Sequence, residues 1–424
     1  MKAPSLTCSR HSQRGAGALV AVILLYVAMS IIVVFTNRNL LVEQKTSTNQ
    51  YRSTLALEAA EAGLEWAVTM MNKPGAITAQ CLDSAVNTDV RFRDKYMSFV
   101  AASDTWLPTA SNTVVASCVT SQSGTDWTCR CPTAGTQPAV AAPAVGGYKP
   151  GFSLAFVTNT ATRAVDLVSY GCTSAINSNT CAGDAAATVR VTVANVTALA
   201  SAPGAPLIAR GQVSVTNGSP GVHNGDQNSG GVTVNAGMGI QSGGFTVTTI
   251  PGTPASSSLI GNDASLRTTS EDQMFQTFFG MPKNTWRDSV ADARIDCSST
   301  CGETNVSTAL GTGTGGARRL WLQGNLVMNA SPTLGSPNDP YIMVVDGTVE
   351  VRGNVISYGV IYSTAATWDN RGSGSATMVG SIISEGNFIN SQGNGQFYYD
   401  PRVNDALRKI PGPFVRVPGT WRDF

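Results

Sequence analysis

The chain has 424 residues, enough for two to four folded domains. Charged residues make up only 13% of it and the formal net charge is +1, so it lacks the basic excess that a nucleic-acid-binding protein needs to neutralise phosphates. Only two histidines occur, His11 and His223, so catalytic triads and imidazole metal sites lack their commonest participant, and we expect no enzyme, cofactor or metal site.

The N-terminus combines a basic leader with an apolar run. Lys2, Arg10 and Arg14 precede the uncharged stretch 16–35, whose 20 residues would span about 30 Å as a helix, the thickness of a bilayer's hydrocarbon core. The run is longer than the apolar region of a secretory signal, and no small-residue cleavage motif follows it. The positive-inside rule then places everything after residue 38 outside the cytoplasm.

A continuous helix is predicted from this run to residue 72. Residues 37–72 lack proline and are rich in helix formers, and Pro74 with Gly75 ends the pattern. Glu58, Glu61 and Glu65 form a strip that we interpret as a solvated face, with subunit contacts as the alternative. Beside that strip runs an apolar stripe at helical spacing, which we expect to pack against a globular head: Leu57, Ala60, Leu64, Val68 and Met71.

Two short motifs carry a family resemblance. The leader reads Gln13-Arg14-Gly15-Ala16, and residues 55–65 are an Ala-Glu-Ala-rich helical segment. At these distances residues 10–72 resemble the N-terminal region of type IV pilus minor pilins of the PilX type. The resemblance implies that a prepilin peptidase cuts between Gly15 and Ala16, with cleavage after Gly17 as the alternative, and that the partners are other minor and major pilins.

One position departs from the pattern of major pilins, which have glutamate at position five of the mature chain. Cleavage after Gly15 puts Val20 at that position. By this resemblance, the absence of the glutamate favours a subunit that primes the pilus or lies at its end over one that repeats along the shaft.

Cysteine usage agrees with export, because eight of the nine cysteines follow the apolar run. We expect disulfides among Cys81, Cys118, Cys129, Cys131, Cys172, Cys181, Cys297 and Cys301. Cys172 with Cys181 and Cys297 with Cys301 are local pairs. Cys129 and Cys131 should each join one of the two remaining cysteines, and both connectivities stay open. No Cys-x-x-Cys motif supports zinc.

The region after the helix is expected to form an antiparallel head. Residues 152–158, 164–170 and 187–196 read as strands of a meander that covers the apolar stripe, as in a pilin head by resemblance. Residues 76–150 are interpreted as a disulfide-bound insertion. The Pro- and Gly-rich segment 201–206 is interpreted as a domain boundary.

The C-terminal region is rich in glycine and repeats weakly. Short strands are predicted in 212–216, 231–234 and 245–250, and residues 353–362 align with 380–389 at an offset of 27, with a third copy at 324–329 and an offset of 29. We favour a short β-solenoid, with a β-sandwich as the alternative, and expect residues 401–407 to cover its open end.

A helical insert is predicted between residues 263 and 293. Ser270 and Gln273 have the spacing of a capping box, and an aromatic cluster of Phe275, Phe278 and Phe279 follows them. We interpret this cluster as core.

Two kinds of polar site were weighed in this region. Polysaccharide cleavage would need carboxylates that stack on one face, but no shared spacing relates Asp346, Glu350, Asp369, Glu385 and Asp400. Calcium binding through Asn224 and Asp226, or through Asn338 and Asp339, is disfavoured against a role in turns, because the nonapeptide calcium repeat is absent.

The expected fold is α+β: a leader at 1–15, a transmembrane and amphipathic helix at 16–72, a pilin-like head at 73–200 and an all-β domain at 201–424 with a helical insert at 264–293. The expected function is that of a minor pilin at the pilus tip or in its priming complex, in the bacterial inner membrane with a periplasmic domain and then in the pilus. The alternatives are an adhesin that binds a host or surface receptor or carbohydrate, and a type II secretion pseudopilin.

Overall fold

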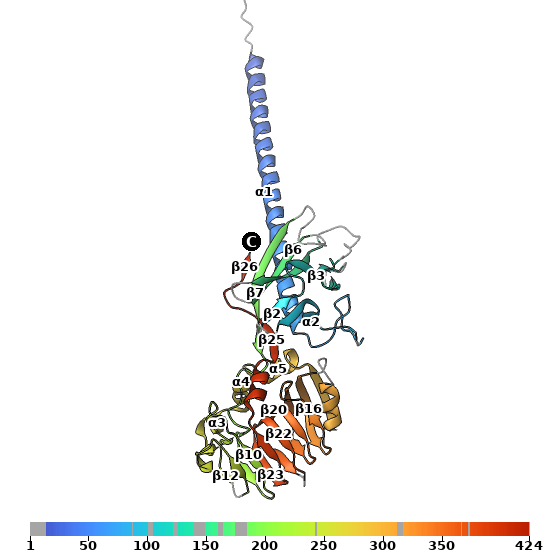
Figure 1. The fold of residues 1–424 in the computed structure, drawn as a ribbon. Coiled ribbons are helices and arrows are strands. Elements are labelled where there is room, and N and C mark those ends of the chain that lie inside the picture. The colour runs from blue at the N-terminus through green and yellow to red at the C-terminus, as the bar shows by residue number, and fades with distance from the viewer. Residues whose placement is uncertain are drawn as a thin grey trace, which may run out of the picture.

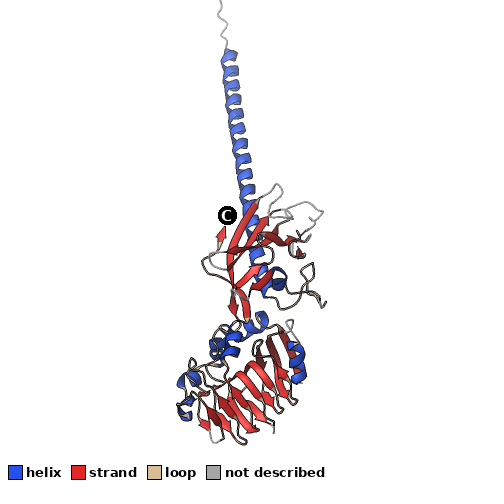
Figure 2. Cartoon of the chain, viewed as in Figure 1, coloured by secondary structure: helices blue, strands red, loops and turns tan. Residues whose placement is uncertain are grey.

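The computed structural model describes residues 14–86, 88–100, 105–121, 126–138, 149–159, 164–173, 185–241, 244–311, 317–365, 367–371 and 374–423. These residues form three parts that follow one another along the molecule (Figure 1). A long helix leads into a β-rich head, and a stack of strands lies beyond the head, at the end far from the N-terminus (Figure 2). The α+β class is therefore as predicted.

Helix α1 (Arg14–Asn72) is a single helix of 59 residues, which corresponds to about 90 Å. Its N-terminal part, Gly17 onward, contains a window apolar enough to cross a membrane, and none of that window is buried in the protein. The helix ends two residues before Pro74, as predicted, because proline disfavours helical geometry in the residue before it.

The head is an antiparallel sheet with the strand order β25-β7-β6-β5-β3-β4. The three predicted strands form the expected meander, since β5 pairs with β6 and β6 with β7. Helix α2 (Phe92–Tyr96) precedes a separate antiparallel pair, β1 (Met97–Val100) and β2 (Thr105–Pro108). The first five strands of the main sheet are β3 (Thr113–Thr120), β4 (Trp127–Arg130), β5 (Gly151–Asn159), β6 (Ala164–Cys172) and β7 (Ala186–Thr197).

The sixth strand of this sheet comes from the C-terminus of the chain. Strand β25 (Pro411–Arg416) and strand β26 (Arg422–Asp423) both pair with β7 in antiparallel fashion. The expected domain at 201–424 is wrong in this respect, because the last residues return to the head. The strands β8 to β24 thus form a separate domain that is inserted in the sequence between two neighbouring strands of the head, β7 and β25. The two chain segments that connect this domain to the head lie side by side.

The inserted domain is a stack of coils joined by parallel ladders, which is a β-solenoid. The sandwich alternative is wrong, because its sheets would be antiparallel. The strands are β8 (Leu207–Ala209), β9 (Val213–Val215), β10 (Gly221–His223), β11 (Val234–Ala236), β12 (Ile240–Gln241), β13 (Thr246–Thr248), β14 (Leu259–Ile260), β15 (Ala293–Cys301), β16 (Arg319–Met328), β17 (Thr333–Leu334), β18 (Tyr341–Asp346), β19 (Val349–Val351), β20 (Ile356–Ser363), β21 (Thr367–Arg371), β22 (Thr377–Ser384), β23 (Asn387–Gln392) and β24 (Gln396–Tyr398).

The register of the coils differs from the predicted repeat. Gly359 lies opposite Gly380, and Leu326 lies opposite Val349, so the coils that contain the aligned segments are shorter than the alignment of the repeats implied. The predicted offsets of 27 and 29 are therefore wrong for these segments. The alignment matched glycines at different corners of the coil, since the neighbour of Gly353 in the next coil is Gly374.

The chain enters the solenoid in the middle of the stack rather than at an end. The coil of β8, β9 and β10 pairs on one side with the next coil along the chain, β11 to β13. On its other side it pairs with β22 to β24, the last coil in the sequence. The first and last coils of the domain in sequence are therefore neighbours inside the stack.

Helices cover parts of the solenoid. The predicted capping box of Ser270 and Gln273 is present, and Phe275 and Phe279 lie in a core beside the stack, where Phe278 packs against them. The hydrophobic side chains of α6 enter the interior at the β15 end, whereas α7 packs along β20 and β22, so residues 401–407 do not cover an end as predicted. The bounds are η1 (Ala255–Ser258), α3 (Ala264–Thr268), α4 (Glu271–Phe279), α5 (Lys283–Ser289), α6 (Glu303–Leu310) and α7 (Pro401–Arg408).

Candidate functional site

The N-terminal half of α1 stands free of the head (Figure 1). Residues 17–51 are all exposed, and Leu24, for example, is 64% exposed. Large apolar side chains in such numbers mark a surface that is covered by lipid or by other protein. Gly15 and Ala16, the expected processing site, lie in the first turn of this helix.

The distal half of α1 docks on the head through the predicted stripe. Ala60, Leu64 and Met71 are buried in the head's core, and Leu57 and Val68 are partly buried against it. The structure thus brings together the five residues that helical spacing selects. Aromatic rings of the sheet and of α2 lie beside them, with Trp66 in edge contact with Phe92.

Two glycines that the sequence analysis did not single out set the distance between α1 and the sheet. A Cβ on Gly171 of β6 would overlap the backbone of Ala56 and Ala60, and a Cβ on Gly63 of α1 would overlap Ser169. Side chains at these positions would separate the helix from β6. Their signal in the sequence is a glycine inside a helix and a glycine inside a strand, where this residue is otherwise unfavourable.

The predicted acidic strip lies on the exposed side of α1. Glu58, Glu61 and Glu65 lie at the surface, and Arg416 from the end of β25 forms an ion pair with Glu65. The hydrogen bond from Arg416 lowers the pKa of Glu65. These residues and Trp421 line a groove of about 370 Å³.

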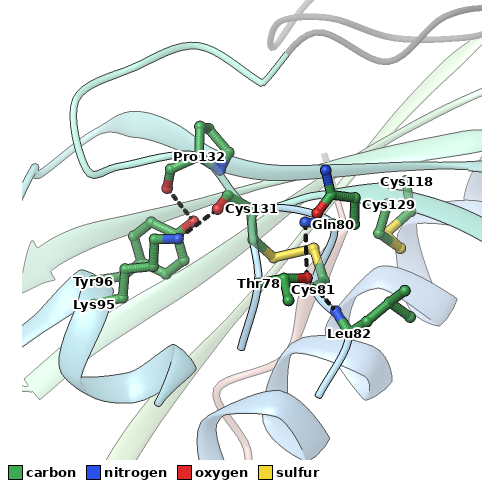
Figure 3. The surroundings of a disulfide bond; sticks show 10 residues. All are labelled: Thr78, Gln80, Cys81, Leu82, Lys95, Tyr96, Cys118, Cys129, Cys131 and Pro132. Atoms are coloured by element: carbon green, nitrogen blue, oxygen red, sulfur yellow. Dashed lines mark hydrogen bonds between the residues drawn. A yellow bond between two sulfur atoms is a disulfide. The ribbon is translucent and has the colours of Figure 1, made fainter. Parts of the chain in front are cut away.

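Two disulfides staple the head (Figure 3). Cys81 is bonded to Cys131 and Cys118 to Cys129, which selects one of the two connectivities that the sequence left open. Two hydrogen bonds from the end of α2 hold the segment around Cys131. The Tyr96 hydroxyl donates to the Pro132 carbonyl at 2.6 Å, and the Lys95 ammonium donates to the Cys131 carbonyl at 2.7 Å. The Cys81–Cys131 disulfide thereby ties the loop that precedes α2 to the residue after β4, and the Cys118–Cys129 disulfide joins β3 to β4.

The remaining cysteines of the expected disulfide set lie in two places. Cys297 is bonded to Cys301 at the β15 end of the solenoid. Cys172, at the end of β6, is disulfide-bonded, and its expected partner Cys181 lies outside the described residues.

An ion cluster that the sequence did not reveal joins the head to the solenoid. Asp292, just before β15, accepts hydrogen bonds from Arg319 of the solenoid, with Nε at 2.9 Å, and forms an ion pair with Arg91 of the head. Arg319 also donates to the carbonyl of Pro411 in β25. One carboxylate therefore ties together segments that are far apart in the sequence.

The charges of this cluster shift its pKa values strongly. Burial alone would raise the pKa of Asp292, but Arg319, Arg91 and the Arg318 N–H outweigh burial and hold that pKa far below its usual range. Burial and the charges of Arg319 and Arg91 lower the pKa of Arg93 to about 10. The guanidinium of Arg93 lies over the Trp106 ring, 5.3 Å from its centroid.

The solenoid carries a polar cleft beside α7. The cleft has a volume of about 560 Å³ and includes Asp226, Tyr399, Asn404, Asp405 and Arg408 in its lining. Asn404 is 2% exposed, and its Oδ1 has no hydrogen-bond partner among the described residues. Asp226 accepts the N–H groups of residues 228 and 229, the role in a turn that we expected for it.

One prediction about acidic residues is wrong. Glu350 and Asp369 were expected to lack a common spacing, but they lie opposite each other in adjacent coils because the coil is shorter here than the predicted repeat. Arginines neutralise both: Arg352 binds Glu350 at 2.8 Å, and Arg371 binds Asp369 at 3.1 Å. The pair is therefore part of an ion network on the solenoid surface.

Comparison with known proteins gives a match at the N-terminus of the chain. Residues 14–65 match the family model described as PilX N-terminal. No curated protein matches the chain. Among solved structures, the competence-associated pilin ComZ from Thermus thermophilus aligns over 88% of this chain and 97% of its own, at 12% identity and a TM-score of 0.23, a score too low to support a structural argument.

Proposed function

From the PilX-type N-terminal region at residues 14–65, which makes the chain a type IV pilin-related protein, we propose that it is a minor pilin at the tip of a type IV pilus. The observation that carries this proposal is the place of the solenoid, which lies beyond the C-terminal end of α1 (Figure 1). The exposed apolar half of α1 would be held first by the membrane and then by neighbouring pilin helices.

The position of the solenoid favours the tip over the shaft for a steric reason. In a filament of parallel pilin helices, the next subunit away from the membrane needs room for its own helix and head beyond this subunit. The solenoid extends into that space, whereas the membrane-proximal side offers a bare helix on which other subunits can pack. A subunit of this shape therefore fits at the end of the filament that lies away from the membrane, where no further subunit is added beyond it.

The route to the tip begins in the inner membrane. A prepilin peptidase would cut between Gly15 and Ala16, and the head with its disulfides would lie in the periplasm until assembly. N-terminal sequencing of the chain recovered from sheared pili tests this route. We expect a terminus at Ala16, and recovery of the chain only in membranes with residues 1–15 attached would contradict the proposal.

A second candidate function, adhesion through the solenoid, is favoured by the polar cleft beside α7. The buried Asn404 Oδ1 lacks a partner among the described residues, and Tyr399, Asp405 and Arg408 offer further polar groups. Such a mixed set suits a hydroxyl-rich ligand such as a carbohydrate.

The topology permits a clean test of adhesion. Because Thr197 of β7 pairs directly with Pro411 of β25, residues 198–410 can be replaced by an Asn-Gly turn that joins the two strands as a hairpin. If the solenoid is the adhesive part, cells with this variant keep their pili and lose attachment. Attachment at the wild-type level would contradict adhesion by the solenoid.

A further inference from the structure

The exposed part of α1 outside the apolar run carries its basic residues on one face. Arg38, Lys45 and Arg52 recur every seven residues. Seven residues are close to two turns of an α-helix, with a drift of about 20° at each step, so the three side chains point in nearly the same direction.

The acidic residues of the same stretch lie on the opposite face. Glu58, Glu61 and Glu65 follow one another at spacings of three and four, and Glu43 lies five full turns of the helix before Glu61. Glu61 is nine residues, or two and a half turns, after Arg52, which places the two sets on opposite sides. All seven charged residues of 37–72 obey this segregation.

The head does not explain the positions of Arg38 and Lys45 on this basic face. Residues 38–51 are exposed and lie outside the cores of the head, and neither Arg38 nor Lys45 takes part in an ion pair within the described part of the chain. Two cations just outside the apolar run thus stand on a stretch of helix that the described residues leave uncovered.

On the basis of the proposed function, we infer that the face with Arg38 and Lys45 docks on the acidic helix face of a neighbouring pilin. Parallel helices whose opposite faces carry opposite charges attract each other in one orientation, basic face to acidic face, and repel in the reverse one. The contact is heterologous, because it joins the basic face of one helix to the acidic face of the next. Subunits joined in this way all point in the same direction along the assembly.

The spacing also sets a register. Arg38 and Lys45 are seven residues apart, as are Glu58 and Glu65. A partner with this acidic spacing would meet both bases when displaced toward the membrane by about 30 Å along the axis. A second copy of this chain in that position would carry its solenoid about 30 Å nearer the membrane, and the proposed tip position has no place for a second solenoid there. Because the solenoid lies beyond the C-terminal end of α1 (Figure 1), we expect the partner to be a pilin without a domain beyond its helix.

The test reverses the two charges in cells that assemble pili. We expect Arg38→Glu with Lys45→Glu to lower the amount of the chain in sheared pili about tenfold, because repulsion replaces attraction at two positions, while its amount in the membrane stays at the wild-type level. Arg38→Gln with Lys45→Gln should give a smaller loss, and Arg38→Lys with Lys45→Arg should give none.

A matched control places the same added charge on the other face. Ser47→Glu with Gln50→Glu puts two carboxylates close to the direction of Glu43 and Glu61, and we expect normal incorporation. Wild-type incorporation of the charge-reversed chain, or an equal loss in this control, would overturn the inference and leave the proposed function standing. Absence of the wild-type chain from pili would instead overturn the proposed function.

Discussion

The head and the solenoid are both built mainly of strands, but they depend on the chain in different ways. The head needs both ends of the sequence that follows the apolar run, since β7 pairs with β25 across the whole insertion, Ala194 with Val415 for example. The solenoid is built mostly from coils that follow one another, and its first and last coils pair with each other. We therefore expect that the solenoid can be removed without unfolding the head, whereas the C-terminal strands cannot.

We expect the largest effect on the folding of the head from a comparison of two deletion variants. A chain truncated after residue 200 loses β25 and β26, and we expect its head to be unfolded or degraded. The chain in which an Asn-Gly turn replaces residues 198–410 keeps both strands, and we expect it to fold. Circular dichroism and protease resistance distinguish them, and equal stability of the two would break the comparison.

The next effect concerns a single side chain of β25. Phe414 is 2% exposed in the head's core, and its backbone exchanges two hydrogen bonds with the Asn72 side chain at the end of α1, at 2.7 and 2.9 Å. We expect Phe414→Ala to lower the free energy of unfolding by about 3–5 kcal/mol. Denaturant unfolding measures this, with Val415→Ala, at the exposed next position, as the control. Equal effects of the two would show that β25 is peripheral to the head.

A smaller effect is expected at the contact between α1 and β6. Gly171→Ala would place a methyl group against the Ala56 carbonyl and force the helix away from the sheet, at a cost of about 1–3 kcal/mol. Gly225→Ala in the solenoid, where open space surrounds the position, is the matched control. A neutral Gly171→Ala would mean that the helix does not lie this close to the sheet.

The smallest effect concerns pH at the junction. The pKa of Asp292 is lowered in the folded protein, so its contribution is complete above the unfolded value of about 4 and is lost as the pH falls through the lower folded value. Hydrogen exchange of α2 should therefore be constant from neutral pH down to about 5 once corrected for intrinsic rates, and should rise in stronger acid.

Two variants sharpen the measurement at the junction. Asp292→Asn should raise the exchange of α2 already at neutral pH, because it leaves Arg91 and Arg319 without their shared carboxylate. Asp405→Asn, at an exposed position of α7, should not. Exchange that is unchanged in Asp292→Asn would show that the cluster does not hold the two domains together.

The elements that sequence predicts well here are those with local signals. The α1 stripe, the meander strands and the Ser270 capping box each rest on spacing within one segment, and the structure confirms them. The coil register was missed because glycines occur at several corners, so a glycine-based alignment matched unlike positions.

The elements that sequence missed depend on distant partners. The sequence analysis predicted no strand at Pro411 and Gly412, because only the pairing with β7 makes them the start of a strand. The junction is similar, because Arg91 and Asp292 are far apart in the sequence and each is an ordinary surface residue by type. The stacked Glu350 and Asp369 could be found only once the coil length was known.

The most direct measurement of the central claim is the position of the solenoid on assembled pili. Gold labelling of an epitope in an exposed solenoid turn, combined with electron microscopy of sheared pili, locates it. The account predicts label at one end of each pilus and none along the shaft. Label distributed along the shaft, or pili free of label while the chain stays in the membrane, would contradict it.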